Sequence, residues 1–384
     1  MRRKKVVVAS HVVHTRFDVL ALLSENYEVT YFSHTLYRNR FWSIFNVISS
    51  TFRNNRNFAG LERAHGSALV LPEVVFKILK RFYSHQVAYK NYALMFDFKV
   101  SRKVKTADIF HWYAGFGERT AIKLKASGAK LICHRRGLAP ETEIRIMQAV
   151  DAKYKYPDEL ILKRLNNEFD LADVILVNSK LTAKSFPTMY WNKIRVLYNC
   201  IDTDYYEFEK KIVFEGIQKI GFVGSLDSRK GLDVLTKAMS YINFNFEIHI
   251  VGSLNGVELD SDSYIDSRIH FHGSLSRHDL KKFYKKMSVT VLPSYSDAYG
   301  LVVAESISSG TPAIASNACG ISELLPPQYV FEAGDPNSLA VALNNLFSSS
   351  EVYLSECQGL SELLQAFGFS KYSRDLKKIY KELS

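Results

Sequence analysis

The sequence predicts an α/β protein made of two domains, each built on a doubly wound parallel sheet. Three observations predict this class: a length of 384 residues, short apolar runs that alternate with longer amphipathic ones, and a turn-rich acidic stretch at 198–214 that divides the alternation. A chain of this length exceeds one ordinary hydrophobic core. Strands that alternate with helices build parallel sheets, whose ligands bind at the carboxyl ends of the strands. We therefore expect the active site in a cleft between the two domains.

Short apolar runs mark the expected strands of both halves. Those of the first half lie at 6–9, 27–32, 108–112, 130–134, 174–177 and 193–197. Those of the second half lie at 220–223, 247–251, 268–271, 289–292 and 311–315. Amphipathic windows between the latter predict helices at 233–239, 279–286 and 302–309.

Composition excludes several classes of protein. Hydrophobic residues make up 47% and charged residues 23%, which is typical of a globular chain rather than a disordered one. The four cysteines stand far apart without a CxxC pair, so neither a zinc site nor a disulfide framework is indicated, and a reducing compartment fits best. The apolar run at 6–9 is too short for a signal peptide, and no window of eighteen apolar residues predicts a spanning helix.

Positive charge is concentrated in the first part of the chain. Residues 1–150 carry 25 Lys and Arg against 10 Asp and Glu, whereas the remainder is slightly acidic. Within residues 38–105, basic and aromatic side chains interleave, which suits an anionic membrane surface. The alternative is a helix with an apolar core face and a solvated basic face. We expect no nucleic-acid partner, because the second half is acidic and no RNA- or DNA-binding motif occurs.

The segment 221–231, Gly-Phe-Val-Gly-Ser-Leu-Asp-Ser-Arg-Lys-Gly, follows an expected strand and leads into a helix. A glycine at the strand end, Gly224, lets the backbone approach a ligand closely. The basic pair Arg229 and Lys230 can neutralise phosphate charge. The alternative is an ordinary turn that carries surface basic residues, which is the commoner case for such a segment taken alone.

A second strand-to-helix segment, 293–312, carries two carboxylates eight positions apart, Asp297 and Glu305. Gly300 is expected in the turn, with the helix beginning near Leu301, so that free N–H groups and the positive helix end suit a diphosphate. The carboxylates can bind sugar and ribose hydroxyls while Arg229 and Lys230 take the phosphate charge. The alternative is a capped helix with acidic residues near its start.

With these motifs the chain resembles the retaining glycosyltransferases of family 4, which have the GT-B fold of two facing Rossmann-like domains. The resemblance covers nearly the whole chain and is most specific between residues 220 and 316. It rests first on Gly224-Ser225-Leu226 with Lys230-Gly231 and on the pair Asp297 and Glu305. Three shorter likenesses add to it: Asn-Cys-Ile-Asp at 199–202, the segment 172–179, and the segment 136–141 that begins Arg-Gly and ends Pro-Glu. It implies that a C-terminal helix at 372–383 crosses back to the first domain. The N-terminal domain is then 1–198 plus 370–384, and the C-terminal domain is 199–369.

The resemblance also implies roles for individual residues. Catalytic roles fall to Asp297, Glu305, Arg229, Lys230 and His134. Donor-binding roles fall to Gly224, Ser225, Gly273, Leu275, Tyr299, Gly300, Leu301, Val302 and Arg136. Glu305 is expected at the ribose, Asp297 at the transferred sugar, and His14 on the acceptor side near the first strand.

Three positions depart from the pattern of the family. Ser225 stands where many members carry a phosphate-binding arginine, for which Arg229 could substitute. Asp297 is one methylene shorter than the commoner glutamate. Cys200 replaces a glycine, and a positive φ there would be awkward for it.

The activity that the resemblance implies is transfer of a sugar, with retention, from a UDP- or GDP-sugar to a glycan or lipid-linked acceptor. It is expected to need no metal or other cofactor and to serve cell-surface polysaccharide or lipopolysaccharide synthesis, in the cytoplasm at the inner membrane face. Two alternatives stay open. One is a weakened relative that binds nucleotide-sugar as a partner or scaffold, and the other is a related epimerase or phosphorylase.

Overall fold

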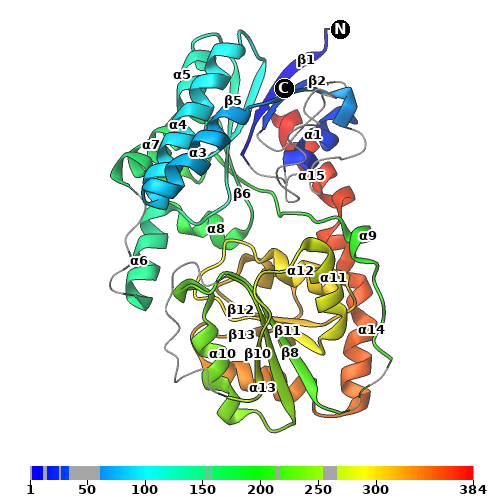
Figure 1. Cartoon of the computed structure of the whole chain (residues 1–384). Coiled ribbons are helices and arrows are strands. Elements are labelled where there is room, and N and C mark those ends of the chain that lie inside the picture. The colour runs from blue at the N-terminus through cyan, green and yellow to red at the C-terminus, as the bar shows by residue number, and fades with distance from the viewer. Residues whose placement is uncertain are drawn as a thin grey trace, which may run out of the picture.

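The computed structural model describes residues 2–11, 15–25, 27–33, 61–151, 154, 158–212, 214, 216–253 and 266–383. In these ranges the chain forms two α/β domains, one above the other in Figure 1, with the N-terminal domain at the top. Both termini lie on the upper domain.

The N-terminal domain is built on a seven-stranded sheet with the order β3-β2-β1-β4-β5-β6-β7. Every pairing in it is parallel. The strands are β1 (Lys4–Ala9), β2 (Tyr27–Ser33), β3 (His65–Ala68), β4 (Ile109–Tyr113), β5 (Lys130–Arg135), β6 (Val174–Val177) and β7 (Ile194–Val196). The central strands are buried on both faces, as parallel strands covered by helices must be.

Helices cover both faces of this sheet. They are α1 (Thr15–Leu23), α3 (Val70–Phe82), α4 (His85–Lys103), α5 (Glu118–Lys125), α6 (Pro140–Val150), α7 (Glu159–Leu171) and α8 (Lys180–Ser185). Phe96, Phe110 and Trp112 lie at the centre of one apolar cluster, and Val6, Val8 and Leu22 belong to the cluster on the other face.

The C-terminal domain repeats the same topology with six strands in the order β10-β9-β8-β11-β12-β13, again all parallel. The strands are β8 (Gln218–Val223), β9 (Phe246–Val251), β10 (Ile269–Phe271), β11 (Val289–Leu292), β12 (Ala313–Ser316) and β13 (Val330–Phe331). Its helices are α9 (Thr203–Tyr206), α10 (Leu232–Ala238), α11 (Arg277–Lys286), α12 (Leu301–Ser308), α13 (Pro336–Leu346) and α14 (Ser350–Phe367). Short 3-10 turns lie at η4 (Ser228–Lys230) and η7 (Gly320–Leu324).

The chain passes between the domains twice. It leaves the upper domain after β7 and returns through α14 into α15 (Phe369–Glu382), which packs against α1 (Figure 1). Tyr372, Leu376, Ile379 and Tyr380 of α15 are buried in the same cluster as Val6 and Leu22. The last helix therefore completes the core of the domain that the chain's first residues begin. The predicted domain boundaries themselves stay a prediction.

The predicted α/β class and the doubly wound parallel sheets are confirmed. Each strand that the apolar runs predicted is present, with ends shifted by at most two residues. β3 and β13 were not predicted, because one is polar and the other has two residues. The expected strain at Cys200 is wrong: among described non-glycine residues, only Asp158 and Glu207 have positive φ. In the described ranges we find no helix long and apolar enough to cross a bilayer.

Candidate functional site

The strand orders place one switch point in each sheet, where the direction of strand addition reverses. These points lie between β1 and β4 in the upper domain and between β8 and β11 in the lower one. The loops that leave such a pair of strands diverge to opposite faces, and ligands of doubly wound sheets bind in the crevice that results. The loops after β8 and β11 carry Lys230 and Asp297, so the two predicted donor motifs flank the lower switch point.

Glycines allow these two loops to close on each other. Gly231 has a φ of 65°, and a Cβ built there would lie 2.0 Å from the carbonyl oxygen of Pro293 in the loop after β11. Gly300 has a φ of 98°, and its Cβ would lie 2.7 Å from Leu292. Only glycine adopts such a conformation in so little space. The helix α12 begins at Leu301, as predicted.

Lys230 and Asp297 form an ion pair at the point where the loops meet. Lys230 Nζ lies 2.6 Å from Asp297 Oδ2, and the two side chains are 13% and 16% exposed. The amide of Tyr299 donates to the other carboxylate oxygen at 3.1 Å. Burial alone would raise the pKa of Asp297, but the charges of Lys230 and Arg229 outweigh it and hold the pKa below its ordinary value. The structure thus brings a cation and a carboxylate together as an ionised pair.

Arg229 and Ser225 occupy the same turn but have other partners. Arg229 Nη1 donates to the carbonyl oxygen of Ser296 at 3.0 Å, and its Nε lies 3.9 Å from an oxygen of Asp227. Ser225 Oγ donates to the second oxygen of Asp227 at 2.5 Å. The guanidinium of Arg229 is therefore bound to the loop that contains Asp297.

The amino end of α12 offers free hydrogen-bond donors beside this pair. Among the contacts of the described residues, the amides of Gly300, Leu301 and Val302 have no acceptor. The first N–H groups of a helix lack partners within the helix, and together with the helix dipole they favour an anion. An anionic group can therefore find amide donors and the Lys230 ammonium at one place.

Glu305 lies one turn further along α12 and faces a different set of groups. Its Oε2 accepts a hydrogen bond from Tyr284 Oη of α11 at 2.8 Å. Burial raises the pKa of Glu305, although the hydroxyls of Tyr206 and Tyr284 and the charge of Arg277 act against the rise. No contact in the described part of the chain joins Glu305 to Arg229 or Lys230. The carboxyl group is thus held by hydroxyl donors, which is the kind of partner that a ribose offers.

The remaining predicted donor residues of the lower domain lie in the loops that follow its strands. The carbonyl oxygen of Gly273 accepts from Gly252 at 2.9 Å, and a Cβ at Gly252 would lie 1.8 Å from the carbonyl oxygen of Gly224. The loops after β8, β9 and β10 therefore touch through glycine backbone. Leu275 is half-buried, whereas the ring of Tyr299 is buried beside Tyr198 of the interdomain segment.

In the upper domain the structure buries His134 rather than leaving it open. Its ring is 1% exposed, lies within β5, and stacks on Tyr113 at 4.6 Å between centroids. Tyr113 Oη donates to Asp18 of α1 at 2.8 Å, and Tyr372 of α15 donates to the same carboxylate. Arg136 follows β5 and is half-buried. The roles predicted for His134 and Arg136 stay predictions, and His14 lies outside the described residues.

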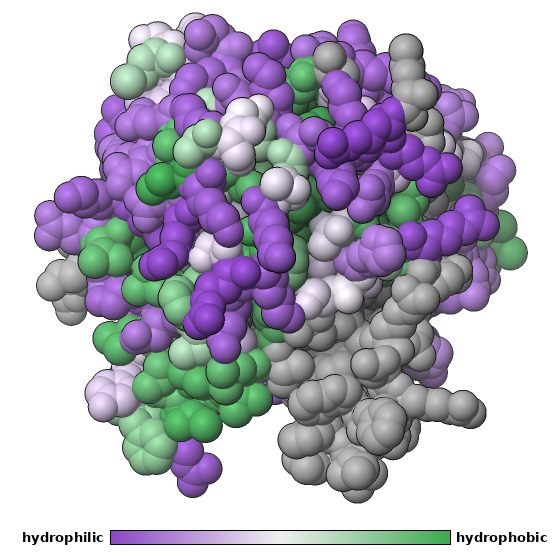
Figure 2. Space-filling view, turned by 90° about the horizontal axis from the view of Figure 1, so that it is seen from above, coloured by the Kyte–Doolittle hydropathy of each residue, from purple (hydrophilic) through white to green (hydrophobic). Residues whose placement is uncertain are grey.

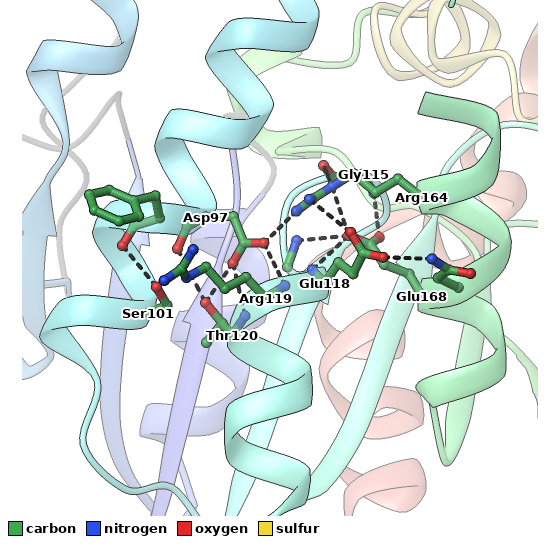
Figure 3. Close-up of polar contacts among 11 residues, drawn as sticks. Asp97, Ser101, Gly115, Glu118, Arg119, Thr120, Arg164 and Glu168 are labelled. Atoms are coloured by element: carbon green, nitrogen blue, oxygen red, sulfur yellow. Dashed lines mark hydrogen bonds and ion pairs between the residues drawn. The ribbon is translucent and has the colours of Figure 1, made fainter. Parts of the chain in front are cut away.

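A buried charge network holds the loop after β4, which borders the upper switch point. Arg164 of α7 forms ion pairs with Asp97, Glu118 and Glu168 (Figure 3). Glu168 accepts from the amides of Gly115, Gly117 and Glu118, and Asp97 accepts from those of Arg119 and Thr120. The network fixes both the loop and the start of α5 and was not predicted, because its members lie far apart in the sequence.

Glu323 of η7 joins the two domains on the side of the interdomain segment. Its carboxylate accepts from the amides of Lys180 and Leu181, which begin α8 in the upper domain, at 2.9 and 2.5 Å. Tyr198 Oη donates to it at 2.7 Å. A carboxylate at the start of a helix is favourable, so this contact stabilises the observed domain arrangement.

A groove of about 1120 Å³ opens where α1, the interdomain segment and the α14–α15 junction meet. Arg16 and Asp202 are among its lining residues and lie 3.9 Å apart. None of the described residues that line it is a predicted site residue. The groups that suit phosphate and hydroxyl binding, a cation, free amides and carboxylates, lie at the switch point instead.

The tyrosines and the arginine around Glu305 are functional candidates that sequence reasoning missed. Tyr206, Tyr284 and Arg277 come from α9 and α11, which the apolar pattern could not place beside α12. The only sequence signal was a basic residue at the start of an expected helix, which is too common to single out.

Comparison with known proteins bears on the fold and the family. The family described as glycosyl transferases group 1 matches residues 217–349. An uncharacterized glycosyltransferase of Methanocaldococcus jannaschii is 28% identical over 223 residues, 56% of this chain and 60% of that protein. The matched segments span between 40% and 60% of the length of the first three curated relatives.

Two solved structures share the fold of the whole chain. Sucrose-phosphate synthase from Thermosynechococcus elongatus has a TM-score of 0.68 at 18% identity and is covered over 99% of both chains. HepE from Anabaena, in complex with UDP, has a TM-score of 0.63 at 12% identity, over 98% of this chain and 100% of that one.

Two facing domains with parallel sheets and mirrored switch points define the GT-B class, which confirms the predicted fold. The C-terminal domain matches the glycosyl transferases group 1 family, and the predicted resemblance to GT4-type glycosyltransferases is confirmed.

Proposed function

We propose that the chain is a retaining hexosyltransferase that moves a sugar from a UDP- or GDP-sugar to a glycan or lipid-linked glycan. The observation that carries the proposal is the Lys230–Asp297 pair beside the free amides of α12. A ligand with both negative charge and hydroxyl groups would use the cation, the carboxylate and the amides together. The UDP complex of HepE supports a nucleotide donor, because that protein shares the fold.

The proposed reaction begins with the diphosphate at the start of α12. An ammonium has three N–H donors, so Lys230 can keep one on Asp297 and direct others to phosphate oxygens. Charge develops on the leaving diphosphate as the glycosidic bond breaks, and preorganised donors at that place lower the barrier. Removal of one such donor commonly costs about 3 kcal/mol.

The carboxylates are assigned to hydroxyl groups. Glu305 is proposed to bind the ribose, where it would exchange its contact with Tyr284 for a substrate hydroxyl or share it. Asp297 is proposed to bind the transferred sugar. The proposal includes no metal and no other cofactor, because Lys230, Arg229 and the amides of α12 supply the positive charge that a diphosphate needs.

Release of nucleoside diphosphate tests the proposal. The purified full-length chain would be incubated with each of a panel of nucleotide-sugars, with and without an extract of lipid-linked and free glycans as acceptors. Release that requires an acceptor, and that Asp297→Asn abolishes, supports transfer. Donor binding by thermal stabilisation without any release would instead indicate a binding partner or scaffold, and the absence of both would refute the proposal.

The helix α3 supports one part of the proposal, which is that the acceptor lies at a membrane. Leu71, Val74, Ile78 and Phe82 lie on one face of this helix and are 43–73% exposed. Phe76, on the opposite face, packs against Tyr92 of α4. Figure 2 shows hydrophobic side chains gathered at its lower left, on the side where α3 lies in Figure 1.

Basic residues border this apolar stripe. Lys77 and Arg81 lie on the turns between its members, and Lys80 is also exposed. An apolar stripe flanked by cations suits an anionic bilayer surface, where the apolar side chains are buried among lipids. The proposed place of action is thus the cytoplasmic face of the plasma membrane, in cell-surface polysaccharide or lipopolysaccharide synthesis. The first part of the predicted basic-aromatic region, 38–60, lies outside the described residues.

Sedimentation with vesicles tests the membrane contact separately from transfer. Wild type is expected to bind phosphatidylglycerol-containing vesicles at low salt, and Ile78→Ser with Phe82→Ser should lose that binding. Val341→Ser is the matched control, since Val341 is an exposed apolar residue of α13. Equal binding by all three proteins, or none by wild type, would exclude α3 as the contact.

A further inference from the structure

Three histidines and a glutamate gather on one face of β9 and β10, at the outer edge of the lower sheet. Glu247 and His249 alternate along β9, and His270 lies directly opposite His249 in the parallel register. His272 follows β10, two positions after His270, and therefore comes to the same face. The donor-site argument uses none of these four side chains.

The side-chain atoms of this group converge. His249 Nε2 lies 3.3 Å and His270 Nε2 lies 4.0 Å from the same oxygen of Glu247. The ligand atoms of Glu247, His249 and His270 all lie within 4.8 Å of one another. Zinc bonds of about 2.0–2.1 Å to nitrogen and oxygen in a tetrahedron place ligand atoms about 3.3 Å apart. Small rotations of the side chains would therefore bring all three to one ion.

The fourth residue, His272, orients the ring of His249 and is not itself one of the three converging ligands. His249 Nδ1 lies 3.0 Å from His272 Nε2, on the side of the ring away from Glu247. When Nδ1 of His249 carries the proton and donates to His272, Nε2 keeps a lone pair on the side of Glu247 and His270. A second ring nitrogen bound to a neighbour is the usual way in which proteins fix the tautomer of a metal-ligating histidine.

We infer that Glu247, His249 and His270 form a binding site for a divalent transition-metal cation of the zinc class, with His272 as a positioning residue. Two imidazoles and a carboxylate are ligands that zinc prefers, and three protein ligands leave one coordination position for water. Glu247 and His270 are partly exposed, which gives an ion access from solvent. Metal occupancy would tie the edge strand β10 to β9 just before the turn at Gly273.

The inference does not depend on sugar transfer, so its test needs no donor or acceptor. Tag-free protein, stripped with a chelator and exchanged into chelator-free buffer, would be titrated with ZnCl₂ in a calorimeter, and Co²⁺ would serve as a probe with visible absorption. We expect saturable one-to-one binding and a higher melting temperature with Zn²⁺. Glu247→Gln and His270→Gln should each abolish the one-to-one step, while their metal-free melting temperatures show that they fold.

His272→Gln separates orientation from ligation. Because it alters only the partner of His249, it should weaken Zn²⁺ affinity by roughly 10- to 100-fold and keep the one-to-one stoichiometry. His278→Gln is the control, since His278 is an exposed histidine of the neighbouring helix α11. The inference is overturned when wild type shows no saturable step, or when Glu247→Gln and His270→Gln bind as wild type does. The latter would move the site elsewhere, for example to the buried group of Asp18, His111 and His134.

Discussion

Replacing Lys230 with methionine should destabilise the lower domain and remove its hold on a diphosphate, and a second substitution can separate the two effects. Methionine keeps most of the side-chain volume but removes the charge. In Lys230→Met, the carboxylate of Asp297, which is 16% exposed, loses a partner at 2.6 Å. A buried charge left without its partner costs about 3–5 kcal/mol. We expect the lower end, about 3 kcal/mol, because Arg229 and the Tyr299 amide still act on Asp297.

The stability lost in Lys230→Met should depend on pH, and the pKa of Asp297 determines the direction. The pKa of Asp297 is held below its ordinary value in the folded wild type. Its contribution to stability is therefore fully present above the unfolded pKa, near 4, and is lost as the pH falls through the lowered folded value. In the variant, burial without Lys230 favours the protonated acid. The difference in stability between wild type and variant should thus be largest at neutral pH and shrink as the pH falls towards the lowered pKa of Asp297 in wild type.

Urea unfolding from pH 3.5 to 8 and donor turnover would be measured for wild type, Lys230→Met, Asp297→Asn and the double variant. The double variant should recover most of the lost stability, because no unpaired charge remains. Its turnover should stay down by at least roughly 10²–10³-fold, because both the phosphate contact of Lys230 and the carboxylate of Asp297 are absent. The reasoning is refuted when the single variant is as stable as wild type at pH 7, or when the double variant regains wild-type turnover.

Three further substitutions test other parts of the structure. Gly231→Ala should lower the free energy of unfolding by more than about 2 kcal/mol, because its methyl group would lie 2.0 Å from the carbonyl oxygen of Pro293. Gly128 also has a positive φ but has open space around it, so Gly128→Ala should cost only about 1–2 kcal/mol in the same urea measurement. Arg164→Met should destabilise the upper domain by about 3–5 kcal/mol, since it leaves buried carboxylates unpaired, and a change below 1 kcal/mol would contradict the network. Glu323→Ala should cost about 1 kcal/mol and increase the radius of gyration measured by X-ray scattering, and an unchanged radius would show that this contact does not hold the domains.

Local sequence signals were sufficient to predict the long strands of both sheets and the start of α12. Apolar runs predicted the long strands because a buried parallel strand needs apolar residues on both faces. The segment His65–Ala68 contains no such run, so β3 depended on its pairing with β2. Gly300 marked the start of α12 because a turn there needs positive φ.

The contacts within the site were less accessible to sequence reasoning. The sequence predicted donor-binding roles for Lys230 and Asp297 but not their ion pair, which depends on β8 and β11 being neighbours at one switch point. The burial of His134 was not predicted, because Tyr113 and His111, which stack on it, come from the neighbouring strand β4. The zinc-class cluster had an alternating signal, Glu247 with His249 and His270 with His272, but only the register of β9 and β10 makes it one group.

The return of α15 to the upper domain has a consequence for biosynthesis. Tyr372, Leu376 and Tyr380 fill one face of the upper sheet, whose strand β1 is translated long before them. That face lacks the cover of α15 until this helix emerges from the ribosome, whereas the lower domain has all of its described strands before then. The half translated first is therefore expected to reach its native packing last.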